Sequence, residues 1–130
     1  MELESKKIVV GKSQGALFEQ LAQVRNFERL MPDNLVKFEM LRDDAFVFAL
    51  KGMPEITLEK KSEVPATQLV LGAPEGKLPF MLTTNLDALS EDSTEVQMHF
   101  NGDFNPLIAM MVKTPLGKLI ETIVSKMQEL

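Results

Sequence analysis

The sequence offers few residues whose type and spacing could carry out chemistry. Gly11-Lys12-Ser13 stands between a strand-like and a helix-like segment, where a phosphate-binding loop would end. That motif requires another glycine five positions before Gly11, and the sequence has Lys6 there. The segment GAPEGK, residues 72–77, is one residue too short for the motif and predicts a hairpin loop. We therefore interpret Ser13 as a helix N-cap, because serine at that position satisfies an unpaired backbone N–H.

The single histidine and the acidic pairs are also poor candidates for catalysis or metal binding. Alternation in TEVQMHFNGDF places His99 beside Gln97 and Asn101, whereas a catalytic imidazole needs a nucleophile and an orienting carboxylate. Asp43-Asp44 and Glu91-Asp92 stand in turn-like, polar segments. The chain has no cysteine and one histidine. We therefore predict no metal site, no catalytic residue and no cofactor.

The composition is that of one globular domain spanning residues 1–130. The net charge is −5, and the 14 basic residues are scattered among 19 acidic ones, so no basic face for nucleic acid is expected. No apolar run is long enough to cross a bilayer, and MELESKKIVV does not resemble a secretory signal. We expect a cytoplasmic protein without membrane insertion. Nine methionines, with no Trp or Tyr, favour an adaptable apolar interior or surface.

Hydrophobic periodicity predicts the order of the elements. A strand over residues 2–10 precedes a helix that begins after Ser13 and a second helical piece, VRNFERLM, which ends at Pro32. Period-two segments then predict six antiparallel strands: 35–41, 46–51, 55–64, 68–73, 80–90 and 94–104. A final helix runs from Pro106 to near Leu130, with Asn105 as its N-cap.

The strands have one apolar and one polar face, because successive side chains of a strand point to opposite sides. The apolar face collects Ile8, Val10, Val36, Phe38, Met40, Phe46, Phe48, Leu50, Ile56, Leu58, Leu82, Leu86, Val96, Met98, Phe100 and Phe104. The pattern predicts a single curved sheet with one face in water and the other covered by the last helix. The same alternation points five polar side chains inward: Glu4, Lys60, Ser62, Thr84 and Thr94. A sheet end or a bulge would instead leave them exposed.

Four segments carry a resemblance to a known superfamily: ESKKIVV, FERLMPDNLVKFEM, FALKGMPEITL and NPLIAMMVKTPLGKLIETI. With the order of elements, they resemble the START-like, or SRPBCC, superfamily, which includes steroid-carrier, pollen-allergen and polyketide-cyclase-like proteins. The resemblance implies an α+β helix-grip fold, in which a curved seven-stranded antiparallel sheet (β-α-α-β6-α) wraps around a long C-terminal helix.

The same resemblance implies a cavity between sheet and helix for a hydrophobic small molecule, such as a lipid, a sterol-like molecule, a polyketide or an isoprenoid. The ligand-binding residues expected here are apolar: Phe38, Met40, Phe46, Phe48, Leu58, Leu82, Met98, Phe100, Leu107, Met110 and Met111. One alternative is a cyclase or hydratase, which would depend on Glu4, Lys60 or a nearby acid. The other is a co-chaperone-like interaction module or homodimer formed through residues 107–112.

The run LIAMMV, residues 107–112, is apolar on all sides of a helix, which requires cover on more than one side. Pro115 follows and predicts a kink between about residues 111 and 115. We expect the first half of the helix to close the mouth of the cavity through Met110 and Met111. The alternative is a kink that only fits the helix to a curved sheet.

Overall fold

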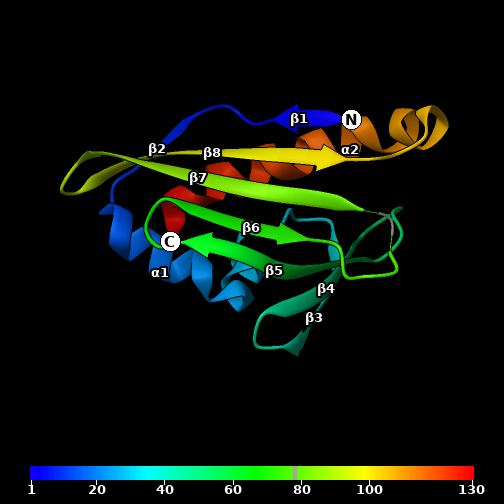
Figure 1. Cartoon of the computed structure of the whole chain (residues 1–130), viewed down its shortest axis with the longest axis horizontal. Coiled ribbons are helices and arrows are strands. Elements are labelled where there is room, and N and C mark those ends of the chain that lie inside the picture. Colours follow the sequence, from blue (N-terminus) through cyan, green and yellow to red (C-terminus); the bar gives the residue numbers. More distant parts are fainter. Residues whose placement is uncertain (78) are drawn as a thin grey trace.

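The computed structural model describes residues 1–77 and 79–130, and it consists of one antiparallel sheet with helices on its inner face (Figure 1). The strands are β1 (Glu2–Glu4), β2 (Ile8–Val10), β3 (Leu35–Arg42), β4 (Ala45–Leu50), β5 (Ile56–Val64), β6 (Gln68–Gly72), β7 (Phe80–Ser90) and β8 (Ser93–Gly102). The helices are α1 (Gln14–Ala22), the 3-10 helix η1 (Val24–Leu30), α2 (Pro106–Lys126) and the 3-10 turn η2 (Met127–Glu129). The strand order is β1-β8-β7-β6-β5-β4-β3, and β2 also pairs with β8.

This arrangement confirms the predicted antiparallel sheet and long C-terminal helix. Ser13 and Asn105 cap α1 and α2, since their side-chain oxygens accept hydrogen bonds from the N–H groups of Ala16 and Ile108 at 3.1 and 2.9 Å. The α2 helix continues through Pro115 and packs on the sheet through a buried stripe of Leu116, Leu119, Ile120, Ile123 and Val124.

The predicted first strand, residues 2–10, is two strands rather than one, because Ser5 interrupts it. Glu4 is opposite His99 and Ile8 is opposite Val96, so four steps along the N-terminal strand match three along β8. The Ser5 hydroxyl accepts a hydrogen bond from the Met98 N–H at 2.9 Å and replaces a backbone acceptor there. The extra residue reverses the facing of side chains before it. Glu4 therefore points outward, and its predicted inward position was wrong.

Replacing Ser5 by alanine is expected to lower the free energy of unfolding by about 1–3 kcal/mol, because the Met98 N–H would be buried without an acceptor. Ser62 provides the matched control, since it is an exposed strand serine. Urea denaturation of Ser5→Ala and Ser62→Ala checks the difference. Equal, small losses in both variants would contradict this role of the Ser5 hydroxyl.

Two further register shifts correct the predicted faces. Val36 lies at a shift between Leu35 and Lys37 in β3, and its side chain is 65% exposed although the alternation placed it inside. Ser62 follows a shift in β5 and is exposed. Thr84 and Thr94 are buried on the inner face, as predicted.

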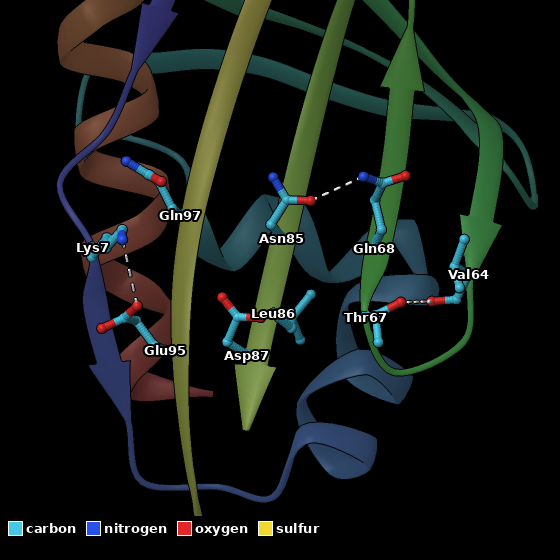
Figure 2. A pocket seen from close by; sticks show the side chains of 9 residues that line it. All are labelled: Lys7, Val64, Thr67, Gln68, Asn85, Leu86, Asp87, Glu95 and Gln97. Atoms are coloured by element: carbon cyan, nitrogen blue, oxygen red, sulfur yellow. Dashed lines mark hydrogen bonds and ion pairs between the residues drawn. The ribbon is translucent and has the colours of Figure 1, made fainter. Parts of the chain in front are cut away.

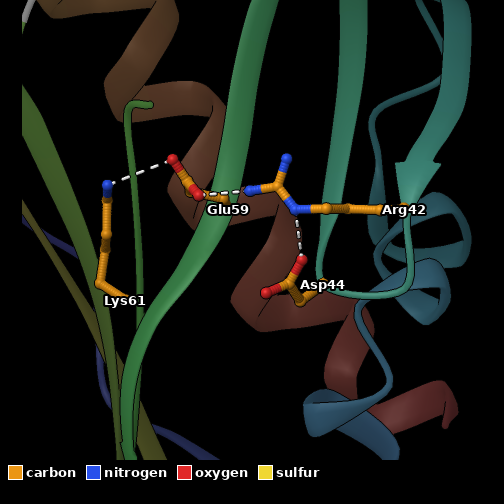
Figure 3. A network of polar contacts seen from close by, with 4 residues as sticks. All are labelled: Arg42, Asp44, Glu59 and Lys61. Atoms are coloured by element: carbon orange, nitrogen blue, oxygen red, sulfur yellow. Dashed lines mark hydrogen bonds and ion pairs between the residues drawn. The ribbon is translucent and has the colours of Figure 1, made fainter. Parts of the chain in front are cut away.

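The outer face of β4 is buried as well, because charged side chains of the neighbouring strands cover it. Its outward residues are small or short: Ala45, Val47 and Ala49. They pair with Glu59, Glu39 and Lys37, whose aliphatic stems can cover apolar surface while their charged ends stay in water. The carboxylate of Glu59 joins a network that Figure 3 shows between Arg42, Asp44, Glu59 and Lys61, whereas Lys37 pairs with Glu39 and Glu55. We assign this network a structural role.

The inner face divides into two halves that are covered differently. At one end, α1 and η1 pack against the sheet, and Phe27 of η1 stacks on Phe46 with ring centroids 5.8 Å apart. Phe46 also stacks on Phe38 at 4.8 Å. At the other end, the N-terminal half of α2 is the cover, and there the side chains leave a space.

Candidate functional site

A cavity of about 370 Å³ lies between the sheet and α2. Aromatic and aliphatic side chains from β4, β5, β7, β8 and α2 form most of its wall. The lining residues are Phe48, Met53, Pro54, Glu55, Ile56, Thr57, Leu58, Ala73, Lys77, Phe80, Leu82, Phe100, Phe104, Ile108, Val112, Leu116, Leu119 and Ile120. Pro54, Glu55 and Lys77 are exposed and mark the opening. The site can therefore enclose an apolar molecule, with the charged residues of its lining at the mouth.

Three stacked or tilted aromatic rings form one wall of the cavity. Phe80 lies 5.4 Å from Phe100, and Phe104 lies 5.9 Å from Phe100, measured between ring centroids. Phe80 begins β7 and Phe100 is near the end of β8, and these two antiparallel strands bring the rings to the same edge of the inner face. Ring faces and edges provide broad apolar contact for a guest.

The predicted ligand-binding residues fall into three groups. Phe48, Leu58, Leu82 and Phe100 line the cavity. A second group packs in or against the hydrophobic core instead, away from the cavity wall: Phe38, Met40, Phe46 and Met98. The third group is exposed: Leu107 at 70%, Met110 at 80% and Met111 at 70%.

The predicted closure of the mouth by Met110 and Met111 is therefore corrected. Side chains four residues apart share one side of a helix, so Ile108 and Val112 continue the buried stripe that begins at Leu116. Met110 and Met111 consequently point away from the cavity. Extending the stripe backward by steps of four, across Pro115, would have found Ile108 and Val112 in the sequence.

The polar rim contains one paired and one unpaired charge. Glu55 accepts a hydrogen bond from the Lys37 ammonium at 2.8 Å, and this bond raises the pKa of Lys37 above its ordinary value. The ion pair with Lys37 thus compensates the negative charge of Glu55 at the mouth. Among the ion pairs of the described residues, none includes Lys77.

The residues considered for catalysis lie elsewhere. The Glu4 carboxylate is 3.5 Å from His99 Nδ1 on the outer face of the sheet. Lys60 Nζ is 3.4 Å from the Glu63 carboxylate, and neither side chain lines the cavity. Within residues 1–77 and 79–130, no cluster of three or more His, Cys, Asp or Glu side chains could hold a metal ion.

A second, polar groove of about 410 Å³ lies on the outer face of the sheet (Figure 2). Its central side chains form a row across three strands, Gln68, Asn85 and Gln97. The Gln68 amide donates a hydrogen bond to Asn85 Oδ1 at 3.0 Å, and the Gln97 amide donates to the Ser5 carbonyl at 2.8 Å. Because these amides pair within the protein, we interpret the row as the solvated face of the sheet.

Known structures share this fold. No family model matches the chain, and no curated protein sequence matches it. A START superfamily protein from Mycobacterium smegmatis is 14% identical, with a TM-score of 0.74 over 98% of this chain and 94% of that one. Norcoclaurine synthase from Thalictrum flavum, in complex with dopamine and hydroxybenzaldehyde, is 12% identical, with a TM-score of 0.73 over 99% of this chain and 84% of that one.

A conserved protein from Geobacillus kaustophilus is similar to the same degree, with 12% identity and a TM-score of 0.73 over 99% of this chain and 93% of that one. At these identities the likeness concerns the fold alone. The chain has the START-like helix-grip fold that its sequence resembles.

Proposed function

We propose that the protein binds a hydrophobic small molecule, such as a lipid, a sterol-like molecule, a polyketide or an isoprenoid, in the cavity between the sheet and α2. The observation that supports this proposal is a mainly apolar cavity of about 370 Å³ between the sheet and α2. Ligand pockets typically measure about 300–1,000 Å³ and are mostly apolar with a few polar groups. The volume favours a guest at the small end of that range.

The shape of the lining favours a guest with an apolar body and a polar end. Most of the wall away from the opening consists of Phe, Leu and Ile side chains, whereas the exposed Lys77 and Glu55 lie at the mouth. Burial of apolar surface contributes about 25 cal/mol per Å², so the apolar body would supply most of the affinity. The structure of norcoclaurine synthase contains dopamine and hydroxybenzaldehyde. It supports the idea that a protein with this fold can bind compact organic molecules.

Native mass spectrometry of freshly purified protein tests the proposal. We expect a non-covalent adduct of defined mass, which organic extraction should release for identification by its fragment ions. A chain that carries no adduct, and that binds no member of a panel of fatty acids, isoprenoids, sterols and polyketides in solution, would contradict the proposal.

No particular observation favours catalysis over binding. The enzyme alternative depended on Glu4, Lys60 or a nearby acid. Glu4 and Lys60 lie outside the cavity lining, and Glu55, an acid within it, is exposed at the mouth and bonded to Lys37. Proton transfer requires a group within hydrogen-bond reach of the reacting atom, directly or through one water. Binding is therefore the function that we carry forward.

A further inference from the structure

The exposed side of α2 carries an apolar stripe directly beside the cavity. Leu107, Met110 and Met111 are spaced i, i+3 and i+4, so they share one side of the helix, and they are 70–80% exposed. Ile108 and Val112, in the same turns, line the cavity on the opposite side. The cavity accounts for the apolar residues on one side of this segment. The apolar residues on the other side are not covered by any part of the described chain.

The stripe is flanked by basic residues. Lys113 and Lys118 are exposed, and Lys118 lies on the same side of the helix as Leu107 and Met111 by helical spacing. No acid occurs between residues 105 and 120, although the whole chain has a net charge of −5. The next acid on the helix, Glu121, accepts a hydrogen bond from the Lys6 N–H at 2.8 Å. We call the surface formed by Leu107, Met110, Met111, Lys113 and Lys118 the α2 patch.

We propose that the α2 patch docks on the surface of an anionic lipid bilayer, where the cavity exchanges its hydrophobic guest with the membrane. This proposal rests on the proposed function, since it names the surface that delivers or receives the guest. Helices with an apolar stripe bordered by lysines lie in the plane of the interface, and lysine adds attraction to anionic lipids. Docking would place the helical turns that carry Ile108 and Val112 directly above the bilayer, with their exposed side in the lipid interface and their opposite side still lining the cavity.

The charges favour a lipid surface over a second copy of the chain. Two α2 patches facing each other would bring four lysines into one interface, and residues 105–120 of neither copy contain an acid to pair with them. The docking is peripheral, because α2 stays packed on the sheet through Leu116, Leu119 and Ile120. None of the described helices is long and apolar enough to span a bilayer.

Sedimentation of the full chain with vesicles tests the proposal. We expect binding to vesicles made of equal parts phosphatidylcholine and phosphatidylglycerol, and weaker binding to phosphatidylcholine alone. Met110→Asp/Met111→Asp should reduce binding to the mixed vesicles by about ten-fold or more, since it removes two apolar groups from the interface. Lys113→Glu/Lys118→Glu should lose the preference for the anionic lipid.

The matched control is Val36→Asp/Leu41→Asp, which exchanges two exposed apolar residues of β3 for the same added charge. This control should sediment like the unchanged protein, and circular dichroism verifies that each variant is folded. Guest binding measured without vesicles should be the same in all four proteins, which separates failure of docking from failure of the cavity. Equal loss in the control, or no sedimentation of the unchanged protein, would overturn the proposal. So would a dimer by light scattering that Met110→Asp/Met111→Asp dissociates, because a second copy would then cover the patch.

Discussion

Replacing Val112 by tryptophan is expected to weaken the binding of a hydrophobic guest by about a hundred-fold or more, which corresponds to about 2.7 kcal/mol. Val112 lines the cavity from α2 and is only half-buried, so its side chain can be enlarged into the space without first displacing the core. The indole would occupy volume that a guest needs in a cavity of about 370 Å³. Titration of the guest identified by mass spectrometry measures the change in Kd.

The absence of tryptophan from the chain supplies a second measurement. The indole of Val112→Trp should emit at shorter wavelength than that of Leu107→Trp, because it would lie in an apolar space rather than in water. Leu107 is 70% exposed on the same helix, so Leu107→Trp is the control and should bind the guest normally. Unchanged affinity in Val112→Trp, together with blue-shifted emission, would show that the guest binds elsewhere.

Much of the fold could be predicted because the spacing of apolar residues shows directly which side of a strand or helix is buried. The period-two segments after Pro32 correspond to β3 through β8, and the narrow stripe from Leu116 to Val124 corresponds to the buried side of α2. Asn105 followed by Pro106 correctly marked the beginning of that helix. These signals depend on residues close together in the sequence, and the tertiary structure agrees with them.

The predicted direction of side chains was wrong where a strand contains one extra residue relative to its partner. Glu4 was expected inside because it shares parity with Ile8 and Val10, but the shift at Ser5 reverses parity before Ile8. The predicted inward position of Val36 was wrong for the same reason, because a register shift lies between Leu35 and Lys37. A bulge depends on which partner groups accept the hydrogen bonds, and the sequence of one strand does not contain that information.

The candidate site could be predicted only in part, because alternation identifies the covered face but not what covers each position. Phe46 and Phe48 have the same facing on β4, yet Phe27 of η1 packs on Phe46, while Phe48 lines the cavity. Phe46 and Phe48 differ in their surroundings because α1 and η1 pack over one end of the sheet only. Likewise, a wholly apolar turn at residues 107–112 predicted cover on several sides, and the described chain covers one of them.

This division of the inner face leads to the largest expected change in stability. Phe46→Ala should lower the free energy of unfolding by about 3–5 kcal/mol, because a fully buried ring would leave a cavity among well-packed neighbours. Phe46 has no exposed surface, and its ring contacts are with Phe27, Phe38 and Phe48. Since small domains are stable by about 5–15 kcal/mol, the variant should unfold at a much lower urea concentration.

Phe104→Ala is the matched comparison, since it removes the same atoms from the other half of the inner face. Phe104 is half-buried and borders the cavity, so its ring has fewer packed neighbours to lose, and the variant should be destabilised much less. Urea denaturation of both variants, made without guest, gives the two free energies. Comparable losses would mean that the cavity half is packed as tightly as the η1 half. A large loss for Phe46→Ala alone would mean that stability comes from the end covered by α1 and η1, which leaves the α2 end free to open for a guest.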